Sequence, residues 1–112
     1  MQYALMIYAD PEQDAARSDA EREAVTGEYL ALVQDPRCVG ATQLQPRATA
    51  TCVRVDGGRT VLSDGPFADT KEVLGGLYFV EAADLDEAVE LASRIPAARY
   101  GGAVEVRPVV QR

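Results

Sequence analysis

The stretch from Ser63 to Glu81, SDGPFADTKEVLGGLYFVE, decides the fold of this chain. It begins with Asp-Gly-Pro-Phe, a run of residues typical of turns, and passes through a short charged segment into a long apolar run. Apolar side chains fall on both faces of the strand that we predict from Lys71 to Ala82, so both faces need to be covered. We therefore expect this strand to lie at the centre of a small sheet, with any ligand site beside it.

The two faces of the predicted central strand can be assigned from alternation alone. One face carries Val73, Gly75, Leu77 and Phe79, and the other carries Leu74, Gly76, Tyr78 and Val80. Two adjacent glycines weaken a strand, so the pair at Gly75 and Gly76 indicates a bulge, a bend, or the close approach of another backbone or a ligand.

Before this stretch, the sequence predicts a strand, a helix, a weaker strand and a hairpin. Residues 2–9 alternate as a strand that is apolar on both faces, and residues 10–17 read as a loop. Ser18 and Glu21 have the spacing of a capping box, which predicts a helix that runs to about Gln34. The apolar stripe of this helix, its expected core face, consists of Val25, Tyr29, Leu32 and Val33. Three strands are predicted after it, over residues 38–45, 48–55 and 59–63, and an Asp-Gly-Gly turn joins the last two.

After the central strand, Asp84 and Glu87 again have capping-box spacing, and Pro96 ends the helix that they begin. A last strand is predicted over residues 103–110. Without the hairpin the order is βαββαβ, so we predict one α+β domain over residues 1–112 with a ferredoxin-like fold and an inserted β-hairpin.

Both helices of that fold cover one face of the sheet. The uncovered face is predicted to be as apolar as the face that the helices cover. A large exposed apolar face is unusual in a soluble protein, so we expect a homodimer that forms a dimeric α/β barrel.

Composition excludes several classes of function. The chain of 112 residues has a net charge of −7, with scattered arginines, which argues against nucleic acid and membrane surfaces as partners. The N-terminal apolar run has no basic segment before it and is too short to span a bilayer, so we expect a cytoplasmic protein.

Histidine is absent, which removes the commonest general base and the commonest transition-metal ligand. Cys38 and Cys52 are expected to be reduced strand residues, and two cysteines without histidine do not make an ordinary zinc site. No metal and no cofactor are therefore expected.

The segment DGPFADTKEVLGGLYFVEAADLDEAVELASRIPAA, residues 64–98, resembles the YCII-related proteins of the DGPF-domain group. The resemblance extends to the first and last strands. It implies a bacterial, dimeric α/β barrel without a settled biochemical activity, in a group whose members often accompany extracytoplasmic-function sigma factors. In some other members of the superfamily a His-Asp pair is suspected of catalysis, and that pair cannot be transferred to a chain without histidine.

Five residues are the candidates for ligand binding, and each has a plainer alternative. Asp64 is a cleft carboxylate or a turn residue, and Phe67 is a pocket wall or a plug packed against the sheet. Lys71 binds an anionic group, or forms a solvated or paired charge with Glu72. Tyr8 and Tyr78 act in a proton relay, or pack in the core or the dimer with a hydrogen-bonded hydroxyl. Arg54 and Arg59, which flank the hairpin turn, read as exposed charges.

Three functions follow as hypotheses. The first is a small-molecule-binding homodimer with a possible regulatory role beside sigma factors. The second is a cofactor-free enzyme for proton transfer on a small carbonyl or aromatic compound, with Asp64 as base and Tyr78 as hydrogen-bond donor; this one rests on analogy between folds. The third is a protein partner of a sigma factor, whose basic surface an acidic chain could meet.

Overall fold

The computed structural model describes residues 1–112 and contains one four-stranded antiparallel sheet, three α-helices and a separate two-stranded hairpin. The sheet has the strand order β2-β5-β1-β6, with bounds β1 Gln2–Ala9, β2 Cys38–Gln43, β5 Val73–Glu81 and β6 Ala103–Pro108. The helices are α1 Pro11–Ala15, α2 Asp19–Val33 and α3 Leu85–Ser93, and the hairpin is formed by β3 Thr51–Asp56 and β4 Arg59–Asp64. Short 3₁₀ turns lie at Arg47–Thr49 and Pro96–Ala98.

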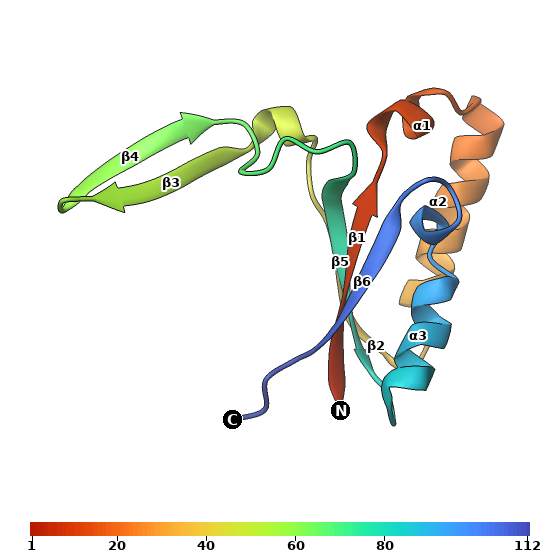
Figure 1. The fold of residues 1–112 in the computed structure, drawn as a ribbon. Helices are drawn as coiled ribbons and strands as arrows, with labels where there is room; N and C mark the ends of the chain where they lie inside the picture. Colours follow the sequence, from red (N-terminus) through yellow and green to blue (C-terminus); the bar gives the residue numbers. More distant parts are fainter.

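The observed topology confirms the predicted ferredoxin-like fold with an inserted hairpin. Strand β5 lies inside the sheet between β2 and β1, as its two apolar faces indicated. The helices cover one face of the sheet, and the hairpin projects away on the other side (Figure 1). No helix has the length and apolar character needed to cross a bilayer.

The core lies between the sheet and the helices. Alternate residues of β1 and β5 point into it and meet the apolar side of α3, and the largest fully buried side chains are Leu5, Val80, Leu91, Ile95 and Pro96. Capping hydrogen bonds fix the residues at which α2 and α3 begin. Ser18 and Glu21 form both hydrogen bonds of the predicted capping box, and Asp84 accepts the backbone N–H of Glu87 at 2.9 Å.

The loop predicted over residues 10–17 is wrong in part, because this segment contains helix α1. The Asp10 carboxylate accepts the backbone N–H of Glu12 at 3.0 Å, and Pro11 occupies the first helical position. A proline there loses no hydrogen bond, since the first N–H groups of a helix have no partner within it. The sequence Asp-Pro-Glu is therefore a helix start.

The glycine pair in β5 has the structure that the sequence predicted. The register between β1 and β5 shifts at this point, since Ile7 pairs with Gly76 and Tyr8 pairs with Leu74, so Gly75 is an extra residue in β5. At Gly76 a Cβ atom would lie 2.7 Å from the carbonyl oxygen of Thr42 in β2. Only glycine allows β2 to approach so closely at this position.

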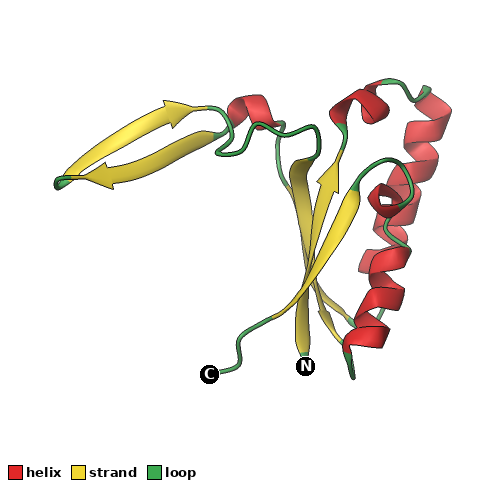
Figure 2. Cartoon of the chain, in the orientation of Figure 1, coloured by secondary structure: helices red, strands yellow, loops and turns green.

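The sheet face opposite the helices is apolar at its centre and uncovered. We call it the open face; it is the bare side of the yellow sheet in Figure 2. The cross-strand pairs Ala4–Phe79 and Met6–Leu77 form its centre, and all four residues are partly exposed. Glu105 and Arg107 form an ion pair on β6 at its rim. An apolar centre with a charged rim has the composition of a protein interface.

Candidate functional site

The main cavity of the molecule is a cleft between helix α2 and the β2–β5 edge of the sheet. It has a volume of about 780 Å³, within the usual range for small-molecule sites. More than half of its 22 lining residues are hydrophobic. Its floor includes Ile7, Gly76 and Tyr78, and the segment that follows β2, residues 44–48, forms one wall.

The cleft exists because α2 lies loosely on the sheet. Of the predicted apolar stripe only Leu32 is fully buried, and Val33 remains 43% exposed. Val33 and Leu30, which is 60% exposed, instead line the cleft from the helix side. Exposed apolar side chains around a concave opening are typical of a ligand site.

Two tyrosines form the polar part of the cleft nearest the core. The Tyr78 hydroxyl donates a hydrogen bond to the Tyr29 carbonyl oxygen at 2.7 Å, which ties β5 to α2. Burial raises the pKa of Tyr78 to about 12, and burial also raises the pKa of Tyr29. Both hydroxyls therefore stay protonated near neutral pH, so Tyr78 acts as a fixed, neutral donor.

The raised pKa of Tyr78 makes stability depend on alkaline pH. In the unfolded chain the phenol ionises near pH 10, whereas in the folded chain it stays protonated up to about pH 12. The contribution of Tyr78 is therefore complete below pH 10 and is lost as pH rises towards 12. We expect the free energy of unfolding to fall over this window by up to about 1.4 kcal/mol per pH unit from this group.

The variant Tyr78→Phe isolates the effect, because it removes only the hydroxyl. We expect it to lower stability by about 1 kcal/mol at pH 7 and to flatten the decline between pH 10 and 12, as measured by urea unfolding. An equally steep alkaline decline in Tyr78→Phe would contradict the assignment.

Near its mouth the cleft carries a cation and several neutral polar groups. The Arg47 guanidinium donates to the Thr70 carbonyl oxygen at 3.1 Å and has no carboxylate partner. Asp14 is already paired with Arg17. The neutral groups are Thr26, Thr42, Gln43 and Gln45. Arg47 is therefore the charged group with free donors for a ligand. No cluster of three or more metal-ligating side chains occurs in the structure.

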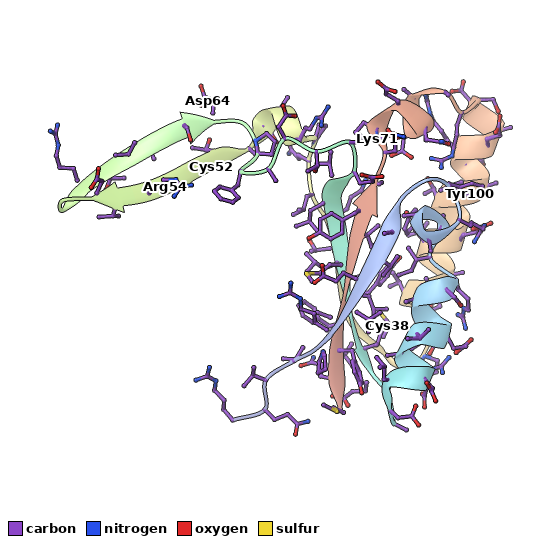
Figure 3. The ribbon with its side chains drawn as sticks, in the orientation of Figure 1. Cys38, Cys52, Arg54, Asp64, Lys71 and Tyr100 are labelled. Carbon is purple, nitrogen blue, oxygen red and sulfur yellow. The ribbon has the colours of Figure 1, made fainter.

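Of the five residues predicted for ligand binding, Tyr78 lines the cleft. Tyr8 is half-buried on β1 and lies outside the cleft lining. Asp64 ends β4 at the base of the hairpin and does not line the cleft, and Lys71 lies near the point where β5 begins (Figure 3). The Lys71 ammonium lies 3.7 Å from the buried Asp10 carboxylate, a partner that the sequence did not indicate.

The prediction that Phe67 packs as a plug against the sheet is wrong for the isolated subunit. Its side chain is 79% exposed, and its ring lies 5.1 Å from the guanidinium carbon of Arg54 on the hairpin. The Asp-Gly-Pro-Phe turn is tied to the base of the hairpin instead, since the Gly65 N–H donates to the Ala50 carbonyl oxygen at 2.8 Å. Arg54 therefore stacks on an aromatic ring and is not simply a solvated charge.

Sequence reasoning did not single out Arg47 or Tyr29 as site residues. Tyr29 was assigned to the core stripe of its helix, and Arg47 stood alone in a polar linker. No local pattern marks Arg47, because its place at the cleft depends on a contact between β2 and β5. Gln45, Pro46 and Arg47 follow the end of β2, where the Leu44 N–H donates to the Gly75 carbonyl oxygen at 2.9 Å.

The four-stranded βαββαβ sheet, covered on one face and hollowed between α2 and the β2 edge, defines a ferredoxin-like α+β protein with a ligand-sized cleft. Within that class, the chain belongs to the YCII-related domain family, whose sequence model matches residues 1–112. It is also similar to an uncharacterised protein of Rhizobium meliloti (strain 1021), with 36% identity over 114 aligned positions. That alignment covers 97% of this chain and 92% of the relative.

Proposed function

We propose that this YCII-related protein is a homodimer that binds a small molecule in the cleft between α2 and the β2–β5 edge. The cleft supports the proposal: it has a volume of about 780 Å³, an apolar lining and a few polar groups at defined places. The open face supports the dimer, because Ala4, Met6, Leu77 and Phe79 form an apolar surface with a charged rim.

The lining favours a ligand with an apolar body and one polar end. Ile7, Leu30 and Val33 offer apolar contact along the cleft. Arg47 has guanidinium donors free of any carboxylate, which suits a carboxylate or a carbonyl oxygen. The net charge of −7 disfavours ligands with several negative charges. A small, mainly apolar acid or carbonyl compound fits these features best.

The direct test is a fragment screen read by NMR chemical shifts on the uniformly labelled protein. We expect hits with an apolar ring and an acid or carbonyl group, and shifts concentrated at Gly76, Tyr78 and Arg47. Hits whose shifts map elsewhere, or a library of such fragments without any hit, would contradict the proposal.

A matched pair of tryptophan variants sharpens the test. Thr26 lines the cleft from α2, whereas Ala24 lies on the same helix, is exposed and does not line it. We expect Thr26→Trp to fill the mouth and weaken binding of the best hit by about tenfold or more. Ala24→Trp should bind it as the unmodified chain does. Equal affinities of the two variants for this hit would show that it does not bind in this cleft.

Two further predictions from the sequence go beyond the cleft. The regulatory setting beside sigma factors rests on the resemblance to the DGPF-domain group. The enzymatic alternative needs Asp64 as base, and Asp64 lies on β4 at a distance from the cleft lining. Both remain predictions, and neither enters the proposal for the cleft.

A further inference from the structure

The hairpin β3–β4, which we call the arm (residues 51–64), is held by very little of its own subunit. Its two strands pair only with each other. Every residue of β4 is exposed, and in β3 only Cys52 is partly buried. A two-stranded hairpin is marginally stable in water by itself. The arm thus has the features of an element that is stabilised by something outside its own subunit.

The arm presents apolar side chains on both of its faces. Val53 and Leu62 are a cross-strand pair with 61% and 64% exposure, and Val55 on the same face is 71% exposed. On the other face Val61 pairs with Arg54, whose guanidinium stacks on the exposed ring of Phe67. Both faces are therefore suited to contact with another protein surface.

The whole chain has more surface than a monomer of its size normally has. Its accessible area is 7644 Å², against about 6,000 Å² expected from the usual scaling for 12.0 kDa. Its radius of gyration is 15.9 Å, where about 13 Å is expected for a compact chain of this length. The surplus area, roughly 1,600 Å², has the size of a substantial protein interface.

The direction of the arm identifies its partner. It leaves the sheet on the side of the open face, so the arm and the open face form two sides of one concave surface (Figure 1). Figure 3 shows the Arg54 side chain on the arm side that faces this concavity, and the Asp64 side chain on the opposite side. A second copy that covers the open face must lie beneath the arm.

We propose that the arm clasps the second copy of the chain, so that each subunit of the dimer holds the other with its hairpin. The proposal rests on the homodimer proposed above and adds a second contact to it, separate from the open face. The arm also begins and ends at walls of the cleft: Pro46 and Arg47 precede it, and Val73 and Leu74 follow it. Docking of the arm on the partner thereby fixes the position of these walls.

The test compares dimer dissociation constants by sedimentation. Val61→Glu places a charge on the side of the arm that carries Arg54 and faces the second copy, because Val61 is the cross-strand partner of Arg54. Val89→Glu makes the same change at an equally exposed residue of α3, which lies on neither surface; both valines are 48% exposed. A second arm variant replaces residues 53–62 by Gly-Gly, which joins the paired residues Cys52 and Ser63 through a tight turn. Because the arm contributes nothing to the core, we expect this shortened chain to fold.

We expect both arm variants to raise the dissociation constant by about tenfold or more, and Val89→Glu to leave it unchanged. A dissociation constant within a factor of about two of the unmodified value in both arm variants would overturn the clasp. The proposed dimer and cleft would survive that result, because they are tested by the unmodified chain and by the fragment screen. An unmodified chain that stays monomeric would overturn the dimer and the clasp together.

Discussion

Replacing Leu77 by glutamate is expected to convert the protein from a dimer into a folded monomer. Leu77 pairs with Met6 at the centre of the open face, where the second copy is proposed to pack. A carboxylate buried there without a partner loses its hydration, and in a two-fold dimer the penalty arises twice. We expect the dissociation constant to rise by about 100-fold or more, as measured by sedimentation velocity over a range of concentrations.

The control for this variant is Leu85→Glu. Leu85 is 52% exposed at the start of α3, on the helix side of the sheet, and an acidic residue in the first turn suits the helix dipole. We expect Leu85→Glu to remain dimeric. A Leu77→Glu protein that dimerises as tightly as the control would show that the open face is not the interface.

Replacing Gly102 by alanine adds only one methyl group, yet it is expected to destabilise the fold strongly. Gly102 lies just before β6, and a Cβ there would lie 2.1 Å from the Tyr8 carbonyl oxygen and 3.2 Å from the Ala9 Cα atom. These are backbone atoms of a central strand, which cannot move aside as a flexible side chain can. We expect the free energy of unfolding to fall by about 3 kcal/mol, as measured by urea denaturation.

Gly27→Ala is the matched control, and we expect it to change the free energy of unfolding in the opposite direction. Gly27 lies within α2, and a Cβ there has no neighbouring atom within 4 Å. Alanine is the better helix former, so we expect Gly27→Ala to stabilise the protein by about 1 kcal/mol. If Gly102→Ala were as stable as the unmodified protein, the described contact between the start of β6 and the end of β1 would be incorrect.

The sheet and its helices could be predicted because they follow from local patterns. Alternation assigned both faces of β5, the spacing of Ser18 and Glu21 gave the start of α2, and the Asp-Gly-Gly turn located the hairpin. The two-residue turn of that hairpin uses positive φ angles at Gly57 and Gly58, which the glycine pair permits. Each of these features depends on residues that lie close together in the sequence.

The site was harder to predict because it depends on distances between elements. Periodicity identified Tyr29 and Val33 as one apolar stripe, but it could not show that α2 lies far enough from the sheet to leave a cleft between them. The exposure of Phe67 was hard to predict for the same reason. An aromatic residue after a turn suggests burial, yet this turn lies at the base of an arm that projects from its own subunit.

The central claim is that a sheet with two apolar faces is completed by a second copy of the chain. Sedimentation of the unmodified protein at micromolar concentration tests it most directly. The account predicts a particle with twice the 12.0 kDa mass of the chain, which dissociates only on further dilution. A particle of 12.0 kDa at every concentration tested would contradict it.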